Sequence, residues 1–114
     1  MLRDKLQMLR DTLATIKGVK VYHYWRPQLK APFIIWAEED EGTSFHANNK
    51  KVNQNIHGVI DFYTKTEYDP VFDEIQNKLN NLDGFSWRWD STQYENETNL
   101  IHHSWDWWVG NGEA

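Results

Sequence analysis

Residues 100–109 read LIHHSWDWWV, and apolar and polar side chains alternate along most of this stretch. Alternation with a period of two is typical of a β-strand that buries one face. Trp105 and Trp107 fall on one face of the strand, whereas Trp108 falls on the other. This stretch therefore predicts a sheet with a tryptophan-rich face and one large apolar residue outside that face.

A strand of the same kind precedes it, because residues 85–90 read FSWRWD. We expect residues 93–99 to form the turn that lets the two strands pair antiparallel. Cross-strand pairing would then gather four tryptophans on one face: Trp87, Trp89, Trp105 and Trp107. The simpler interpretation of this stripe is a core beneath helices, and the alternative is a flat aromatic platform for a sugar or a protein partner.

Two stretches show the periodicity of amphipathic helices. The first carries an apolar stripe at spacings of three and four residues and stops at Gly18: Leu2, Leu6, Leu9, Leu13 and Ile16. The second has Asp69 as its N-cap and Pro70 at its first position, and Asp83 and Gly84 close it. Its stripe has the same spacing: Phe72, Ile75, Leu79 and Leu82.

Three further strands are predicted between the helices, at residues 19–25, 33–37 and 55–65. Residues 27–31 fit a hairpin loop between the first two of these strands. Residues 38–55 are polar and read as a long loop, and loops of that length are often functional.

The expected order is α-β-β-β-α-β-β, which predicts an α+β two-layer sandwich. Its sheet would be mostly antiparallel, with about five strands and with both helices on one face. The chain has 114 residues, which suits one domain. We expect that domain to span residues 1–109 and a flexible C-terminal tail to span residues 110–114.

The amino-acid composition excludes several classes of function and of site. The chain carries 17 acidic and 12 basic residues, for a formal charge of −5, which argues against a sequence-specific or general nucleic-acid binder. It has no cysteine, so disulfides, thiolate metal sites and cysteine nucleophiles are excluded. No apolar run is long enough for a membrane span and no signal segment opens the sequence, so we expect a protein made and folded in a cytosol.

No motif predicts a catalytic, metal or cofactor site, and we expect a protein that is not an enzyme. His102 and His103 face opposite sides of a strand, although His57 could approach His103 from a neighbouring strand. The acidic run at residues 38–41 lacks the spacing of a calcium-binding loop. Nucleophile elbows and phosphate-binding glycine loops are absent from the sequence, whereas a carboxylate pair for glycoside hydrolysis stays open among the 17 acids.

Four segments resemble a family of small tail proteins from siphophages and prophages of Gram-positive bacteria, described as minor capsid, tail-completion or tail-terminator proteins. The similarity covers roughly residues 19–108. It is carried by YHYWRP at 22–27, IIWAEE at 34–39, DFYTKTEYDP at 61–70 and QYENETNLIH at 93–102.

This resemblance implies a small α+β domain that forms a hexameric ring. Such a ring caps the tail tube and offers a docking surface to the head. The implied partners are further copies of the chain, the tail-tube protein and the head–tail connector protein. The implied location is the neck or tail of a virion assembled in the bacterial cytoplasm. A connector role is the nearest alternative, and a tryptophan-rich carbohydrate-binding module is a more distant one.

A ring contact joins two different patches of each subunit, and the sequence offers candidates for them. The long polar stretch carries an acidic group and a basic pair, which we expect to contact a neighbouring subunit or the tail tube: Glu38, Glu39, Asp40 and Glu41, then Lys50 and Lys51. Trp108, outside the main stripe, is the candidate apolar anchor.

Overall fold

The computed structural model describes residues 1–25, 30–42, 45–47 and 50–110, and for 45–47 and 50–53 it describes the backbone alone. Two helices and seven strands are present in these residues. The helices are α1 (Leu2–Ala14) and α2 (Val71–Asn80). The strands are β1 (Lys20–His23), β2 (Phe33–Glu41), β3 (Phe45–Ala47), β4 (Lys50–Asn53), β5 (Asn55–Thr64), β6 (Phe85–Glu95) and β7 (Leu100–Gly110).

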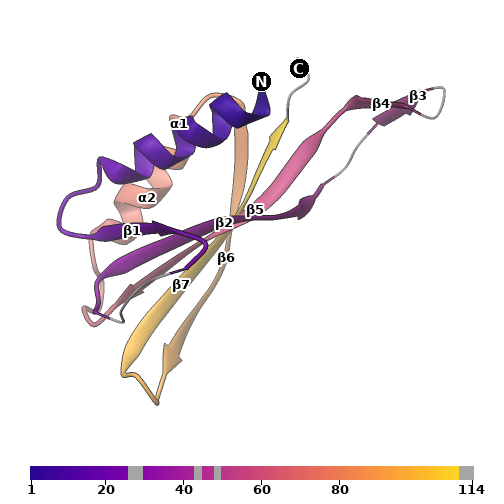
Figure 1. Cartoon of the computed structure of the whole chain (residues 1–114). Coiled ribbons are helices and arrows are strands. Elements are labelled where there is room, and N and C mark those ends of the chain that lie inside the picture. Colours follow the sequence, from indigo (N-terminus) through magenta and orange to yellow (C-terminus); the bar gives the residue numbers. More distant parts are fainter. Residues whose placement is uncertain (26–29, 43–44, 48–49, 111–114) are drawn as a thin grey trace.

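Five strands form one sheet in the order β1-β2-β5-β7-β6, and β3 and β4 form a separate two-stranded sheet (Figure 1). Three of the four neighbouring pairs in the large sheet are antiparallel. Both helices lie on one side of it (Figure 1). The predicted α+β fold, with its order α-β-β-β-α-β-β in the main sheet, is confirmed.

The hairpin predicted between β1 and β2 is wrong, because these two strands are parallel. Lys20 lies opposite Phe33, and His23 lies opposite Trp36. Nine residues separate the end of β1 at His23 from the start of β2 at Phe33, which is more chain than a tight hairpin needs. Period-two alternation assigns residues to faces but does not specify strand direction, so both pairings fit the same pattern.

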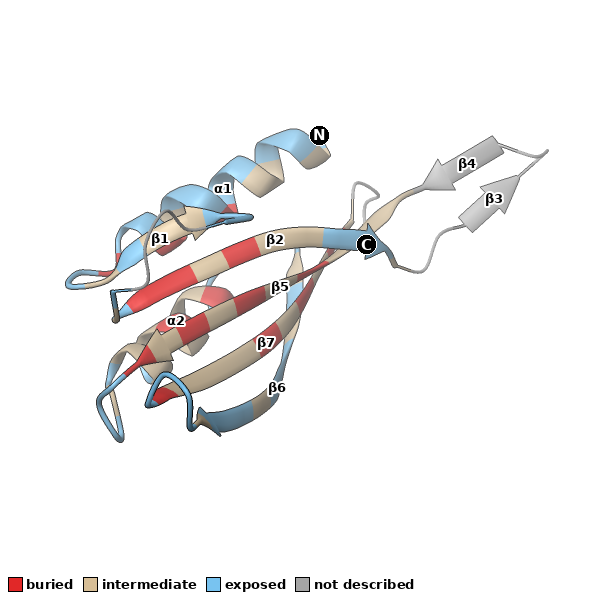
Figure 2. Cartoon of the chain, turned by 60° about the horizontal axis from the view of Figure 1, so that its bottom comes forward, coloured by how far each residue is buried: buried red, intermediate tan, exposed pale blue. Residues whose placement is uncertain are grey.

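The core lies between the sheet and the two helices. Leu9 and Leu13 of α1 and Ile75 and Leu79 of α2 are buried. They pack in one cluster with inward side chains of the strands, which include Ile34, Trp36, Ile60, Phe62, Trp105, Trp107 and Val109. Figure 2 shows these buried positions along the middle strands.

The tryptophan stripe belongs to this core. Trp87 lies opposite Trp107 and Trp89 lies opposite Trp105, as the alternation predicts. Trp105 and Trp107 have no exposed surface, whereas Trp89 at the far end of the stripe is 47% exposed. The buried indoles keep their hydrogen bonds, because Trp105 Nε1 donates to Gln76 Oε1 at 3.1 Å and Trp107 Nε1 donates to the carbonyl of Val59 at 3.1 Å.

Asp69 caps the start of α2 as predicted, although the helix begins one residue late, at Val71, with Pro70 at the N-cap position. Asp69 Oδ1 accepts a hydrogen bond from the Val71 amide at 3.0 Å, and its Oδ2 accepts one from the Thr64 hydroxyl at 2.7 Å. Pro70 already has helical dihedrals, with φ −64° and ψ −16°. The carboxylate thus fixes the connection between β5 and α2.

The long loop predicted for residues 38–55 is also wrong. The acidic residues Glu38–Glu41 continue β2, and a bulge separates Glu38 from Asp40 where they pair with β5. Backbone pairing with β5 overrides the low strand propensity of these carboxylates. β3 and β4 then form a hairpin, which we call the arm, and Figure 1 shows it projecting from the body.

The arm makes the molecule long. The whole molecule measures 51 × 26 × 24 Å along its principal axes, and its radius of gyration is 15.3 Å. A compact chain of this length would have a radius of gyration of about 13 Å. At the root of the arm the Gly42 amide donates to the carbonyl of Asn55 at 2.9 Å, so backbone pairing between the two chain segments continues up to the point where the arm begins.

The last strand extends one residue beyond its predicted end at Val109 and into the predicted tail. β7 ends at Gly110, and residues 111–114 lie outside the described part of the chain. Neither helix that the structure describes has the length and apolarity to cross a membrane.

Candidate protein interface

The sheet face opposite the helices, which we call the open face, is covered by no helix in the described residues (Figures 1 and 2). Cross-strand partners share a face, so the register assigns the residues of this one. Its central strand β5 presents His57, Val59, Asp61 and Tyr63 there. These four side chains are half-buried, whereas Phe33 of β2, opposite Tyr63 on the same face, is buried.

A chain of hydrogen bonds crosses four strands on the open face. His57 of β5 lies between two carboxylates: its Nδ1 is 2.8 Å from Asp40 Oδ1 on β2, and its Nε2 is 2.8 Å from Asp106 Oδ1 on β7. Arg88 Nη2 of β6 donates to Asp106 Oδ2 at 2.8 Å. We call these four residues the His57 network. Their formal charges cancel when His57 is protonated.

The geometry of the His57 network favours that protonated form. Both ring nitrogens can donate only in the imidazolium. Partial burial by itself lowers the pKa of His57, but the hydrogen bonds to Asp106 and Asp40 outweigh it and raise the pKa above its usual value. Burial likewise raises the pKa of Asp106, and the bonds from Arg88 and His57 outweigh it and lower that pKa.

Trp108 lies beside the His57 network on the open face. It is directly opposite His57 in the β5–β7 register, and the two rings are 5.2 Å apart, centroid to centroid. The indole is half-buried, and a methyl group placed on Gly42 at the root of the arm would lie 3.3 Å from its Cδ1. Two separate sequence candidates, Asp40 and Trp108, are therefore brought together around His57.

The structure separates Glu38 from the rest of the acidic group. It points to the edge strand β1, where its Oε1 is 2.5 Å from His23 Nε2 and its Oε2 accepts a 2.5 Å bond from the Tyr24 hydroxyl. The bulge after Glu38 changes which face the following carboxylates occupy. Burial raises the pKa of Glu38, but the bonds from Tyr24 and His23 outweigh it, so that pKa is lowered. The hydrogen bond from the Tyr24 hydroxyl to Glu38 also raises the pKa of Tyr24.

The other predicted interface residues divide into two groups. Glu39 and Asp40 have side chains that are 51% and 68% exposed, so both are accessible to a partner. Glu41 is exposed at the end of β2. Lys50 and Lys51 belong to β4 in the arm, and their side chains lie outside the described part of the structure.

A second histidine–carboxylate pair lies further along the open face. His102 Nε2 is 2.7 Å from Asp61 Oδ1, and its Nδ1 is 3.6 Å from Glu95 Oε2. Its ring also stacks on Tyr63 at 4.2 Å. The sequence correctly placed His102 and His103 on opposite faces, because His103 instead contacts Phe62 and Phe72 on the helix side.

The proposed approach of His57 to His103 is wrong. His57 lies opposite Trp108, whereas His103 lies opposite Phe62, five positions away along β7. Sequence reasoning also missed Arg88 and Asp106 as functional candidates. The available signal was alternation, which puts Asp106 and Trp108 on one face, but the β5 register that adds His57 cannot be deduced from it.

In the described residues no group of three or more histidines and carboxylates has a geometry that could hold a metal ion. The chain matches no protein-family model, and no curated protein sequence matches it. The chemistry of the open face thus consists of paired charges beside an indole and an exposed acidic edge, which suits contact with another protein.

Proposed function

We propose that this chain is a non-enzymatic virion assembly protein, and specifically a tail terminator that caps the tail tube as a ring and docks the head. The observation that carries the proposal is the open face: one side of the sheet carries the helices, and the described residues place no helix on the other. An arm extends from that same sheet (Figure 1). A structural subunit requires such contact surfaces and no catalytic centre.

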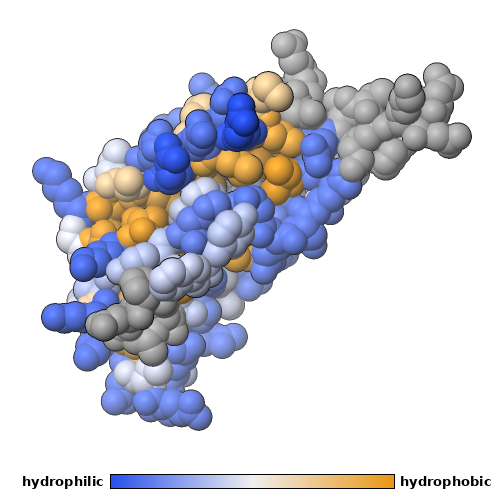
Figure 3. All heavy atoms as spheres, in the orientation of Figure 1, coloured by the Kyte–Doolittle hydropathy of each residue, from blue (hydrophilic) through white to orange (hydrophobic). Residues whose placement is uncertain are grey.

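The segments that resemble tail-completion proteins occupy defined places in the fold. IIWAEE lies in β2, whose end leads to the arm, and DFYTKTEYDP connects β5 to α2. QYENETNLIH covers the end of β6, the turn at residues 96–99 and the start of β7. Figure 3 shows that turn as a hydrophilic end of the molecule, whereas apolar side chains are visible beneath α1. Unlike surfaces at different ends of one subunit are what a ring between a tube and a head requires.

We infer that Trp108 and the adjacent acidic edge of β2 form one contact of the ring and that the arm forms another. The indole supplies apolar area, and Glu39 supplies exposed charge at its border. A neck connector would use the same surfaces, and binding to the tail-tube protein distinguishes the two roles. The carbohydrate platform gains no support, because Trp105 and Trp107 are buried under the helices.

The test combines the purified chain with tail-tube protein and follows mass by light scattering and shape by electron microscopy. We expect rings that bind the ends of tubes and stop their growth. A variant that joins Gly42 directly to Asn55 through a short glycine-rich turn removes the arm while keeping the hydrogen bond at its root. We expect it to remain folded and to lose assembly.

Charge reversal gives a finer test of the acidic edge. Glu39→Lys should weaken assembly without unfolding the subunit, because this side chain is 51% exposed. Asp40→Lys would in addition break the bond to His57, so the single change at Glu39 is the cleaner variant. Asp11→Lys on α1, whose side chain is 69% exposed, is the matched control for a charge change on the helix side. Unchanged assembly in Glu39→Lys would exclude the acidic edge as a contact.

A further inference from the structure

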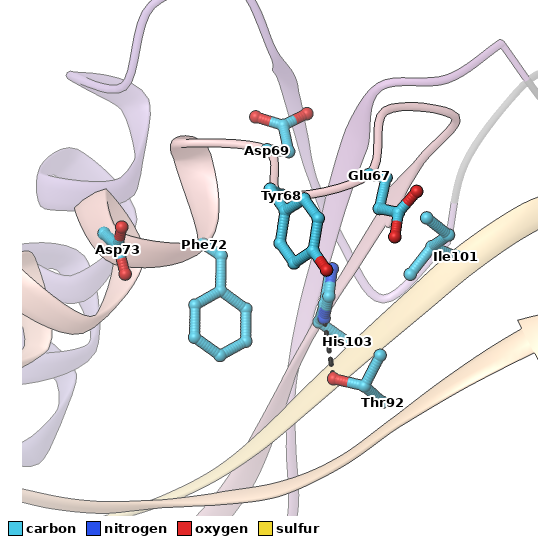
Figure 4. A pocket seen from close by; sticks show the side chains of 8 residues that line it. All are labelled: Glu67, Tyr68, Asp69, Phe72, Asp73, Thr92, Ile101 and His103. Atoms are coloured by element: carbon cyan, nitrogen blue, oxygen red, sulfur yellow. Dashed lines mark hydrogen bonds between the residues drawn. The ribbon is translucent and has the colours of Figure 1, made fainter.

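A cavity of about 430 Å³ lies on the helix side of the sheet, away from the open face. Its walls come from the β5–α2 connection and the first turn of α2 on one side and from β6 and β7 on the other (Figure 4). This volume is within the usual range of pockets that bind small groups. The residues that define its chemistry are Glu67, Tyr68, Asp69, Phe72, Asp73 and His103.

The walls of this cavity are aromatic. Phe72 packs edge-on against His103, with ring centroids 4.8 Å apart at 70°. His103 is held from the other side by Thr92, whose hydroxyl is 2.8 Å from Nδ1. Tyr68 is 93% exposed and has φ 57°, a backbone conformation that a tyrosine rarely adopts. Figure 4 shows its ring in front of His103 and beside Phe72.

The rim of the cavity is acidic. Glu67, Asp69 and Asp73 all border it, and no lysine or arginine is among the described residues that line it. Asp69 is engaged by Thr64 and by the Val71 amide. Glu67 and Asp73 are exposed and form no ion pair within the part of the chain that the structure describes.

His103 in the wall carries little competing positive charge at neutral pH. Burial lowers the pKa of His103, and this effect outweighs the attraction of Asp69. Two carboxylates that form no ion pair in the described residues thus border a cavity with aromatic walls. A planar cation matches both features, because a guanidinium stacks on aromatic faces and pairs with carboxylates at its edges.

We propose that this cavity receives the guanidinium group of an arginine side chain from a basic partner protein. The acidic rim of the cavity favours a basic partner protein over a second copy of this chain, which carries a net charge of −5 itself. This proposal rests on the proposed assembly function, because assembly is what would bring the basic partner protein to the cavity. The cavity itself can be tested on the isolated chain, so the two proposals can fail separately.

The test is a titration of the purified chain with N-acetyl-arginine amide, followed by NMR of backbone and indole signals. We expect saturable millimolar binding, with shifts confined to the β5–α2 connection, the start of α2 and His103. N-acetyl-citrulline amide has the same shape without the charge and should not bind. No saturable shift with the arginine compound, or equal binding of the citrulline compound, would overturn the proposal.

Two sets of variants locate the binding. Asp73→Asn combined with Glu67→Gln should weaken binding severalfold, whereas Glu74→Gln, a similar change one residue along α2 and outside the cavity, should not. Tyr68→Phe should bind normally and Tyr68→Ala should lose affinity. Circular dichroism checks that each variant is folded, and an unchanged affinity in the double variant contradicts the proposal.

Sedimentation of the chain at increasing concentration tests whether the cavity receives a basic partner protein or a second copy of this chain. The partner assignment predicts that arginine amide leaves the sedimentation of the chain alone unchanged. Self-association that arginine amide reverses, and that is absent in the double variant, would assign the cavity to a second copy and overturn the basic partner.

Discussion

His57 and Asp106 are joined across β5 and β7 by a 2.8 Å hydrogen bond from diagonal positions, because His57 lies opposite Trp108 and Asp106 lies opposite Val59. The bond connects the strand that leads out of the arm to the final strand of the sheet. Asp40 and Arg88 extend it to β2 and β6. The His57 network therefore links β2 and β5, the two strands that lead into the arm, to β7 and β6 of the body.

This coupling predicts a pH dependence of stability. The pKa of His57 is raised in the folded chain above its ordinary 6.5, so the contribution of His57 is complete below about pH 6.5 and is lost as pH rises through the folded-state pKa. The pKa of Asp106 is lowered from 3.8, so the contribution of Asp106 is present above pH 3.8 and is lost as pH falls through its folded-state pKa.

Thermal melts between pH 5 and pH 9 measure the histidine part. The wild-type chain should lose melting temperature relative to His57→Gln as pH rises through the folded-state pKa of His57. The comparison is needed because the lowered pKa of His103 acts in the opposite direction. Parallel pH profiles for the two proteins would contradict the assignment.

Asp106→Asn should destabilise the chain by about 1–3 kcal/mol, because it removes the negative charge and replaces one of the two oxygens that accept bonds from His57 and Arg88 with an NH₂ donor. The Asp106 side chain is 14% exposed, so water replaces the lost bonds poorly. Asp90→Asn is the control: that carboxylate is 50% exposed and lies 3.9 Å from Arg88, and its loss should cost under about 0.5 kcal/mol. Urea unfolding measures both changes, and equal costs would argue against the network.

Gly58 is predicted to tolerate no side chain. A methyl group there would lie 2.1 Å from Trp107 Cζ2 and 2.4 Å from the carbonyl oxygen of Ala37. Gly58→Ala should therefore cost about 2–4 kcal/mol in urea unfolding, since neither the buried indole nor the backbone can move freely. Gly42→Ala meets the half-buried Trp108 at 3.3 Å and should cost under about 1 kcal/mol. A mild effect at Gly58 would show that the sheet is packed less tightly than described.

Neighbouring tryptophans should separate stability from assembly. Trp107→Ala should cost about 3–5 kcal/mol, because Trp107 is fully buried. Trp108→Ala should leave a folded subunit that assembles poorly, because its indole borders the open face. Circular dichroism and light scattering on both variants check this contrast. Normal assembly of Trp108→Ala would remove Trp108 as an interface anchor.

Much of the fold could be predicted from local patterns. The apolar stripe that starts at Leu2 and the Asp69 cap identify the helices because helix periodicity and capping are local properties. The end of α1 was predicted less well, because the helix stops at Ala14, before Ile16 and the predicted stop at Gly18. The pairing of Trp87 with Trp107 followed from alternation and one short turn. These features depend on residues close in sequence, and the structure confirms them.

What could not be predicted depends on distant pairing. The direction of β1 relative to β2 leaves no trace in either strand, and the acidic end of β2 is a strand only because β5 pairs with it. The candidate site shows the same division. Asp40 and Trp108 were chosen from sequence, but His57, which joins them, is found only from the β2–β5–β7 register.

We propose that this chain assembles with itself into a ring that caps a tail tube. The most direct test is the mass of the purified chain by light scattering, over a range of concentration and salt, alone and with tail-tube protein. We expect a closed ring near hexamer mass, formed alone or upon addition of the tube protein and bound at tube ends. A monomer in every condition, with tube growth unaffected, would contradict it.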